Sequence, residues 1–152
     1  MNAYKGMYLD SLGNVIPGAS LEGPYSSGIP GSVAGMQALH DSLGSLPWSQ
    51  LIQPAIDLAI NGVVLDKQRT QYLNVYAERI RKWNPNECSY IFPSEGKEWS
   101  VGDTLFHPEL AKVLMEIRDH GSDGFYRGWV ADSMISYLHL SLIHISEPTR
   151  PY

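Results

Sequence analysis

Cysteine is nearly absent from this 152-residue chain, which contains only Cys88. A single cysteine permits neither an internal disulfide nor a Cys-x-x-Cys metal or redox motif. Its neighbours at residues 84–89, NPNECS, are typical of a loop, and no histidine lies nearby in the sequence. We therefore interpret Cys88 as incidental, and the sequence excludes a disulfide-stabilised scaffold.

Basic residues are also few, with 11 Lys and Arg against 16 Asp and Glu and a formal net charge of −5. Without a Lys/Arg cluster, the chain lacks the positive surface that binds nucleic acid or an anionic membrane. No apolar run is long enough to span a bilayer, and no signal peptide is recognisable. Because the chain begins in the middle of a pattern, we expect Met1 to be an internal start.

Motifs for phosphate, dinucleotide or zinc chemistry are missing as well. The chain has no GxxxxGK(S/T) loop, no GxGxxG turn and no HExxH pair, and its five histidines follow no metal-ligand spacing. Residues 40–42, HDS, are consecutive, and neighbours on a helix point in different directions, so they cannot align as a catalytic triad. His107 and His120 stand at predicted helix ends and Glu109 in a first turn, where interactions with the helix termini explain them.

The residues that are present are typical of a globular chain. Hydrophobic residues make up 43%, and the length is enough for one ordinary domain. Residues 7–30 are rich in Gly and Pro turns, whereas apolar residues recur at helical spacing from residue 32 on. We predict an α+β fold that is mostly helical, with a short extended region at residues 90–105.

Two helices are predicted between residues 32 and 62. Ser32 caps the first, and Gly44 ends it. Pro47 suits the first position of the second helix, Pro54 predicts a kink or a restart within it, and Gly62 ends it. The predicted apolar faces are Val33, Met36, Leu39 and Leu43 in the first helix, and Leu51, Ala55, Leu58 and Ala59 in the second.

Three further helices are predicted. Asp66 caps a helix that runs to Trp83. Pro108 opens another that ends at Gly121, and the last begins near Asp123. Their apolar residues, which we expect in the core, are Leu73, Tyr76, Ile80 and Trp83, then Leu110, Val113, Leu114 and Ile117, then Phe125, Val130, Met134 and Leu138.

A series of short segments runs through the chain in an informative order. The longest, residues 27–62, is SGIPGSVAGMQALHDSLGSLPWSQLIQPAIDLAING. The others are MYLD at residues 7–10, LEGP at residues 21–24, GDTL at residues 102–105, PELA at residues 108–111 and DGFYRG at residues 123–128. Through these segments the chain resembles, over about residues 4–138, the large-subunit region of the gamma-glutamyltranspeptidase family, also called glutathione hydrolases.

The resemblance implies a fold and a chemistry. Members are N-terminal-nucleophile hydrolases with an αββα sandwich, of which this stretch would supply helices and little of the central sheet. The precursor cleaves itself, and the threonine newly exposed on the small subunit attacks the gamma-glutamyl amide, with its own amine as base. Water then completes hydrolysis of glutathione, or an amino acid or peptide amine completes transpeptidation, without a metal or redox cofactor.

No functional residue of the family can be assigned in this chain. The nucleophile's Thr-Thr-His-like motif is absent, and Thr70, Thr104 and Thr149 have other surroundings. The family's arginine that binds the substrate carboxylate lies upstream of the part that matches residue 4. The arginines of this chain match helical surface instead: Arg69, Arg79, Arg81 and Arg118. We predict no catalytic, cofactor-binding or metal-binding residue, and no activity for the chain alone.

The last residues depart from this resemblance. Residues 140–150, LSLIHISEPTR, are the translation of a nucleotide string that resembles a transposase-type sequencing adapter. We expect residues 1–139 to be a partial large-subunit region, Leu140 to Tyr152 to be a non-native tail, and the parent gene to continue past Leu138. The alternative for residues 140–145 is a genuine apolar strand.

As a fragment, the chain would derive from a gamma-glutamyltransferase that acts on glutathione and other gamma-glutamyl compounds, with amino acids or peptides as acceptors. By resemblance, we expect the parent to pair with its own small subunit and to be periplasmic or extracellular. Two alternatives stay open: a non-catalytic helical interaction domain, and a related N-terminal-nucleophile acylase or amidohydrolase. Apolar faces left uncovered would make the isolated chain marginal, aggregation-prone or molten.

Overall fold

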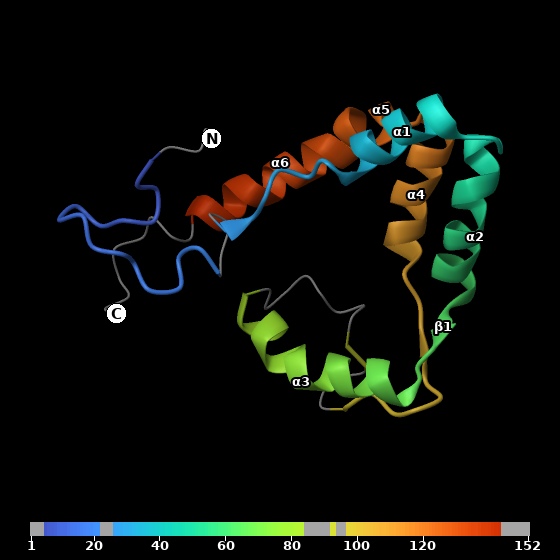
Figure 1. Cartoon of the computed structure of the whole chain (residues 1–152). Coiled ribbons are helices and arrows are strands. Elements are labelled where there is room, and N and C mark those ends of the chain that lie inside the picture. Colours follow the sequence, from blue (N-terminus) through green and yellow to red (C-terminus); the bar gives the residue numbers. More distant parts are fainter. Residues whose placement is uncertain (1–4, 22–25, 84–91, 94–96, 144–152) are drawn as a thin grey trace. The chain divides into compact units, whose positions relative to one another are not determined.

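The structure is a computed structural model that describes residues 5–21, 26–83, 92–93 and 97–143. The chain divides into two compact units, Met1–Gly31 with Ala131–Tyr152, and Ser32–Val130. Most of the described elements are helices, and the sheet found among the described residues has two strands (Figure 1). The prediction of a mostly helical chain is confirmed.

The core of the unit Ser32–Val130 lies between two helices, α2 (Trp48–Asn61) and α4 (Pro108–His120). Ile56 is fully buried, at 0% exposure, because it faces α4 from the middle of α2. Its buried neighbours and the apolar side chains packed around them are Ala59, Ala111, Ile52, Leu114 and Met115. Residues 52, 56 and 59 recur at i, i+4 and i+7, which is the spacing of one helix face.

Polar contacts hold the same two helices in register. Trp48 Nε1 donates a hydrogen bond to the carbonyl oxygen of Ile117 at 2.8 Å. Arg118 Nη1 donates to Gln53 Oε1, also at 2.8 Å. Gly62 ends α2, as predicted, with φ of 84°, a conformation that favours glycine.

A short antiparallel pair connects the two core helices. β1 (Val63–Val64) pairs with β2 (Thr104–Leu105), so that Val63 lies opposite Leu105 and Val64 opposite Thr104. β2 falls in the predicted extended region, whereas β1 was not predicted. Two residues are too few to show the alternation by which a strand is recognised in a sequence.

Helix α3 (Lys67–Trp83) lies between the two strands in the sequence. Asp66 Oδ1 accepts a hydrogen bond from the backbone N–H of Arg69 at 2.8 Å, which confirms the predicted cap. Further along, the Asn74 side chain donates to the backbone oxygen of Trp99 at 2.9 Å and accepts from its N–H at 3.0 Å. This double contact ties the chain that returns to β2 onto one side of α3.

A tight corner follows α4. The single helix predicted from Asp123 is in fact two, α5 (Asp123–Tyr126) and α6 (Gly128–Ile143), because Gly128 adopts φ of 63° and interrupts the helix. Gly124 lies so close to α4 that a Cβ there would come within 2.1 Å of the Glu116 backbone oxygen. Residues 140–143 belong to α6, so the strand alternative is wrong for them; residues 144–145 lie outside the described part.

Helix α1 (Ser32–Leu43) docks on this corner. The Gln37 side-chain oxygen accepts a hydrogen bond from the backbone N–H of Ser122. The backbone N–H of Ala34 donates to the Tyr126 hydroxyl oxygen at 3.3 Å. Both the helix and its end before Gly44 were predicted from the sequence, but Ser32, predicted as the cap, is the first residue of the helix.

Several predicted apolar faces are not the ones that are buried. In α2, Leu51 and Leu58 are exposed, and Ile56, outside the predicted face, is buried. Pro54 lies inside an unbroken α2, so the predicted restart does not occur, and Pro47 is the cap residue rather than the first residue of the helix. Which side of α2 is buried depends on the position of α4. The spacing of apolar residues within α2 carries no information about that position.

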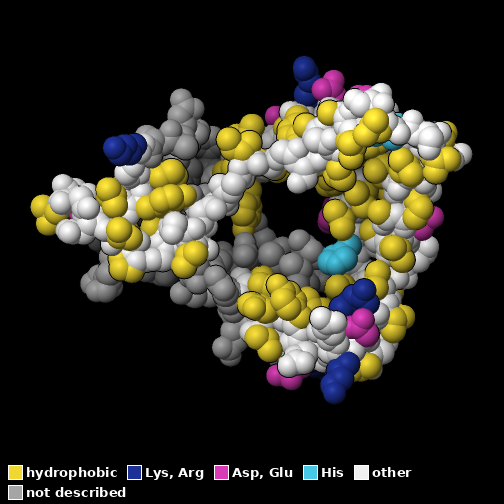
Figure 2. Space-filling model, in the orientation of Figure 1, with side chains coloured by type: hydrophobic (Ala, Val, Ile, Leu, Met, Phe, Trp, Pro, Cys, Tyr) yellow, Lys and Arg dark blue, Asp and Glu magenta, His cyan; other side chains and the backbone are white. Residues whose placement is uncertain are grey.

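The same discrepancy affects the other helices. In α1 only Val33 of the predicted face is buried, and in α4 Leu110 is exposed while Ala111 is buried. In α3, Tyr76 is exposed, and the side chain of Trp83 lies outside the described part. Hydrophobic side chains accordingly cover much of the surface visible in Figure 2.

Residues 7–21 consist mainly of turns, as predicted. Leu9 and Val15 form an isolated antiparallel bridge around a turn that Asp10 organises. The Asp10 carboxylate accepts hydrogen bonds from the N–H groups of Asn14 at 2.8 Å and Leu12 at 2.9 Å. These hydrogen bonds lower the pKa of Asp10 because they stabilise its charged form. The bond from the Asn14 backbone N–H has the largest effect.

Candidate functional site

A hollow of about 440 Å³ lies at the start of α3. Its lining residues come from the segment before α3, from the first two turns of α3 and from β2: Leu65, Asp66, Gln68, Arg69, Tyr72, Leu73 and Leu105. Backbone hydrogen bonds place Leu65 beside the returning chain, since its N–H donates to Asp103 at 2.8 Å and its oxygen accepts from Gly102 at 2.9 Å. The β1–β2 pairing thus builds the hollow from residues about 40 positions apart in the sequence.

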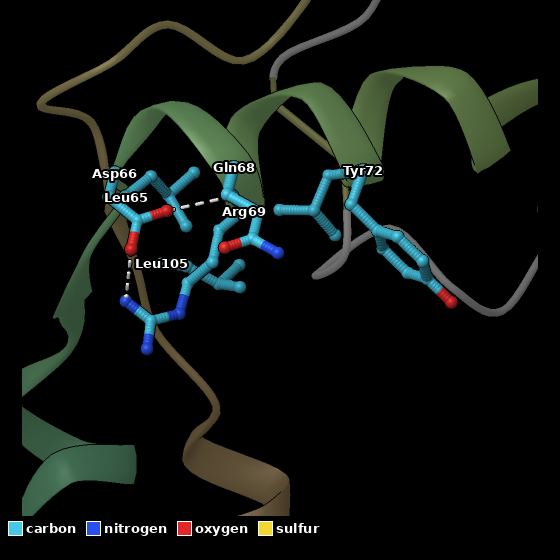
Figure 3. Close-up of a pocket in the computed structure, with 7 residues that line it drawn as sticks. Leu65, Asp66, Gln68, Arg69, Tyr72 and Leu105 are labelled. Atoms are coloured by element: carbon cyan, nitrogen blue, oxygen red, sulfur yellow. Dashed lines mark hydrogen bonds and ion pairs between the residues drawn. The ribbon is translucent and has the colours of Figure 1, made fainter.

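The hollow has an apolar floor and a polar rim. Leu65 is only 2% exposed, and Leu73 and Leu105 are half-buried. At the rim, Arg69 Nη1 lies 2.8 Å from Asp66 Oδ2 in an ion pair whose two side chains are largely exposed. Figure 3 shows the Arg69 side chain turned back toward Asp66, while the Tyr72 ring extends away along α3. An exposed pair of this kind adds about 0–1 kcal/mol to stability.

The lining offers polar groups that could bind a ligand but no paired nucleophile and histidine base. The lining contains no Ser, Thr, Cys or Lys nucleophile and no His base. Its one carboxylate, Asp66, is already engaged by the Arg69 N–H and guanidinium. In the part of the chain that the structure describes, no group of three His, Cys, Asp or Glu side chains could hold a metal ion. The hollow is therefore a candidate recognition surface.

The consecutive His, Asp and Ser in α1 form no triad, as the sequence predicted. His40 Nε2 lies 2.8 Å from the Leu46 backbone oxygen, and its ring packs edge-on against Trp48 with centroids 5.2 Å apart. The Ser42 hydroxyl donates to the Ala38 carbonyl oxygen at 2.9 Å. His40 thus contacts the segment that follows α1 and the start of α2, whereas Ser42 bonds within α1.

The residues predicted at the ends of α4 lie there. Glu109, in the first turn, accepts a hydrogen bond from Lys112 Nζ at 2.8 Å. His107 is the residue before the helix, although its side chain does not cap the helix. His120, in the last turn, has its Nδ1 3.1 Å from Glu116 Oε2. Glu116 also accepts from Trp129 Nε1 at 2.9 Å. The sequence did not reveal this link from α4 to the start of α6, because its two residues lie 13 positions apart.

The arginines lie on helices, as expected from their spacing. Arg69 and Arg81 belong to α3, and the Arg81 guanidinium lies 4.3 Å from the centroid of the Phe92 ring. Arg118 belongs to α4 and donates two hydrogen bonds to Asp119, which raise the pKa of Arg118 and lower that of Asp119. The side chain of Arg79 lies outside the described part.

Comparison with known proteins assigns the chain to a family. The family model described as gamma-glutamyltranspeptidase matches residues 1–141. The chain therefore belongs to the gamma-glutamyltranspeptidase family, which confirms the resemblance seen in the sequence.

Individual relatives make the assignment more specific. The chain is 39% identical to the glutathione hydrolase proenzyme of Pseudomonas sp. (strain A14), over 86% of this chain and 22% of the relative. It is 38% identical to the capsule biosynthesis protein CapD proenzyme of Bacillus anthracis, over 76% of this chain and 21% of the relative. The chain thus spans about a fifth of the length of these curated relatives, as expected of a fragment.

Solved structures agree with this assignment. The crystal structure of Helicobacter pylori gamma-glutamyltranspeptidase matches with a TM-score of 0.84 at 37% identity, over 90% of this chain and 39% of that one. The Bacillus anthracis transpeptidase CapD matches with a TM-score of 0.68 at 38% identity, over 82% of this chain and 43% of that one. Most of this chain therefore has a counterpart in solved structures of the family.

Proposed function

We propose that the parent protein of this chain transfers or hydrolyses the gamma-glutamyl group of glutathione and related amides. The observation that carries the proposal is the family match over residues 1–141, together with relatives named glutathione hydrolase at 35% to 39% identity. The helices described above would cover one side of an αββα sandwich, most of whose central sheet comes from other parts of the parent.

In this proposal the reacting groups belong to the rest of the parent. A threonine exposed by self-cleavage, with its own amine as base, attacks the gamma-glutamyl carbonyl carbon, and the amine of cysteinylglycine leaves. Water or an acceptor amine then releases the gamma-glutamyl group from the enzyme. Relatives named as proenzymes support a precursor that requires processing. The partners are the donor, the acceptor and the small subunit, no metal or redox cofactor is needed, and the parent acts in the periplasm or outside the cell.

A second candidate function rests on the CapD match. Its 38% identity lies within the range of the glutathione hydrolases, so identity does not separate glutathione hydrolysis from a transpeptidase reaction in capsule biosynthesis. The lining of the α3 hollow does not separate them either, because it contains no nucleophile and base. A related acylase and a non-catalytic helical module are the remaining alternatives.

The first experiment is to recover the full gene from the source DNA and to read it on both sides of residues 4–138. We expect an Arg-Glu-x-Ala-Pro-like segment upstream and a Thr-initiated small subunit downstream. An intact reading frame that ends at Tyr152 would instead favour the non-catalytic module. The same sequence shows whether the codons of residues 140–152 belong to the gene.

The second experiment is to express the recovered precursor and to follow its self-cleavage and its release of glutamate from glutathione. The control is the precursor with the nucleophilic threonine changed to alanine, which should neither cleave nor react. We expect no glutamate release from the 152-residue chain alone. A processed enzyme that rejects glutathione but transfers a capsule polymer would favour the second candidate.

A further inference from the structure

We propose that Asn61, the last residue of α2, is a site of spontaneous deamidation that the folded chain blocks and unfolding opens to reaction. Asn61 is exposed and is followed by Gly62, and the two form the one Asn-Gly pair in the sequence. The modification needs only water and hydroxide as co-reactants. The inference goes beyond the proposed function and does not depend on the activity of the parent.

The reaction joins the side chain of Asn61 to the backbone of Gly62. The Gly62 nitrogen loses its proton to hydroxide and attacks Asn61 Cγ, so that an N–Cγ bond forms, the Cγ–Nδ2 bond breaks, and the amide nitrogen leaves as ammonia with a proton from water. Water then opens the cyclic imide: attack at Cγ gives aspartate, and attack at the backbone carbonyl carbon gives isoaspartate. Glycine favours the first step because it has no side chain to hinder the attacking nitrogen.

Two features of the helix end block this first step. The attacking group is engaged, because the Gly62 N–H donates a hydrogen bond to the Leu58 carbonyl oxygen at 2.9 Å. Asn61 belongs to the helix, and a helical ψ of about −42° keeps the following nitrogen far from the plane of Cβ and the backbone carbonyl in which the imide ring closes. The end of α2, residues 58–62, must therefore open before the imide can form.

The returning chain holds the same helix end from another side. The backbone N–H of His107 donates to the Ala59 carbonyl oxygen at 2.9 Å. Gly62 is closely packed, since a Cβ there would clash with the side chains of Thr104 and Phe106. Opening of residues 58–62 thus requires α2 to separate from β2 and from the segment that leads into α4.

Isoaspartate would leave a lasting mark at this corner. Its main chain runs through Cβ and Cγ, and is therefore one carbon atom longer between residues 61 and 62. In the intact corner, Gly62 bonds to Leu58 while Val63 lies directly opposite Leu105 in the β1–β2 pair. A longer connection between these two contacts prevents both from being restored, whereas aspartate keeps the original backbone length.

The test measures modification of residue 61 by mass spectrometry in the full-length protein that the recovered gene encodes, in mildly alkaline buffer with and without urea. We expect Asn61 to react at least about tenfold more slowly without urea, because only molecules with an open helix end react. The internal control is Asn14, which is exposed but followed by Val15, and which should react much more slowly than Asn61 in urea. Equal rates at Asn61 in the two conditions, or no product in urea, would overturn the proposal.

Variants test whether packing of α2 provides the protection. Ile56→Ala loosens α2 against α4 and should raise the rate without urea about tenfold or more. The matched control is Leu58→Ala, which changes an exposed side chain, keeps the backbone acceptor and should leave the rate within about twofold. If Ile56→Ala does not fold, Ile56→Val is milder and should raise the rate about threefold. Equal effects of the substitutions at residues 56 and 58 would contradict the protection by α2.

A second measurement follows the product. Protein deamidated in urea and then refolded should lose amide protection at Leu65, whose N–H donates to the Asp103 oxygen at 2.8 Å in the intact corner. The loss should follow the isoaspartate content, measured by methyl transfer with an isoaspartate-specific methyltransferase. Asn61→Asp, with its normal backbone length, should retain the protection, and an equal loss in this variant would refute the role of isoaspartate.

The outcomes separate this inference from the proposed function. A parent that releases glutamate from glutathione but has an unreactive Asn61 in urea refutes the modification site alone. A parent whose Asn61 reacts only on unfolding, and which shows no gamma-glutamyl activity, refutes the function alone.

Discussion

The α2–α4 pair and α3 have similar apolar spacing but differ in burial. In the pair, Ile56 is completely buried against α4, whereas Tyr72 on α3 is 62% exposed. The difference comes from the connections. The backbone N–H of His107 donates to Ala59 at 2.9 Å, which brings α4 back beside α2, while Asn74 secures one side of α3 and leaves another open. Helical spacing of apolar residues thus predicts that one face of a helix is buried. It does not say whether this chain contains the segment that covers that face.

The largest effect is expected at the centre of the helix pair. Ile56→Ala should destabilise α2 and α4 by about 2–5 kcal/mol, up to the full stability of the chain, because it removes buried methyl groups and leaves a cavity. Faster amide exchange in both helices would show this. The control is Leu58→Ala on the same helix, where the side chain is 56% exposed and the expected change is within about 0.5 kcal/mol. Similar losses at both positions would mean that the α2–α4 core is not packed as described.

The corner after α4 should be the next most sensitive position. Gly124→Ala would bring a Cβ within 2.1 Å of the Glu116 oxygen, which is backbone and cannot rotate away, so we expect a loss of about 1–3 kcal/mol. Urea denaturation followed by circular dichroism measures it. Gly35→Ala in α1, where nothing lies within 4 Å, should instead be neutral or stabilise by up to about 1 kcal/mol. If Gly124→Ala is also neutral, the close contact of α5 with α4 is wrong.

A smaller effect is expected at the start of α3. Asp66→Ala removes the acceptor for the Arg69 N–H and should destabilise the first turn of α3 by about 1 kcal/mol. Asp66→Asn keeps an acceptor and should retain most of that stability, although it removes the ion pair with Arg69. Amide exchange of residues 67–70 distinguishes the two variants. Equal losses in both would show that the ion pair, and not the cap, stabilises this turn.

The smallest effect is expected on the open face of α3. In the isolated chain, Tyr72→Ser should change the free energy of unfolding by about 0.5 kcal/mol or less, because the ring is largely exposed and its contact is with the neighbouring Tyr76. Urea denaturation of the two proteins checks this. A loss as large as that of Ile56→Ala would show that α3 already has a partner within the chain, which would remove the difference between the two regions.

Local signals in the sequence account for where most of the helices begin and end. The Asp66 cap and the stop at Gly62 were predicted because capping and positive φ are properties of one or two residues. The restart predicted at Pro54 and the unbroken helix predicted through Gly128 were wrong. Pro54 is exposed inside a continuous α2, and whether Gly128 adopts a positive φ depends on the corner around it.

The hollow could not be predicted from local signals. Its floor combines Leu65 with Leu105, which meet only because β1 pairs with β2. The link from Glu116 to Trp129 likewise joins residues whose separation follows no helical or strand period.

No helix among the described residues is both long and apolar enough to cross a membrane. The marginal stability predicted for the isolated chain stays a prediction that thermal unfolding will test.

By itself, the sequence determined the mostly helical character of the chain, the cap at Asp66, the helix ends at Gly62 and Gly121, and its membership of the gamma-glutamyltranspeptidase family. These depend on short-range backbone preferences and on the order of motifs along the chain. Only the tertiary structure decided that Ile56 is buried while Leu58 is exposed, that the last predicted helix is broken, and that one face of α3 is open. Burial depends on which segments meet in space, and helical spacing does not encode that contact.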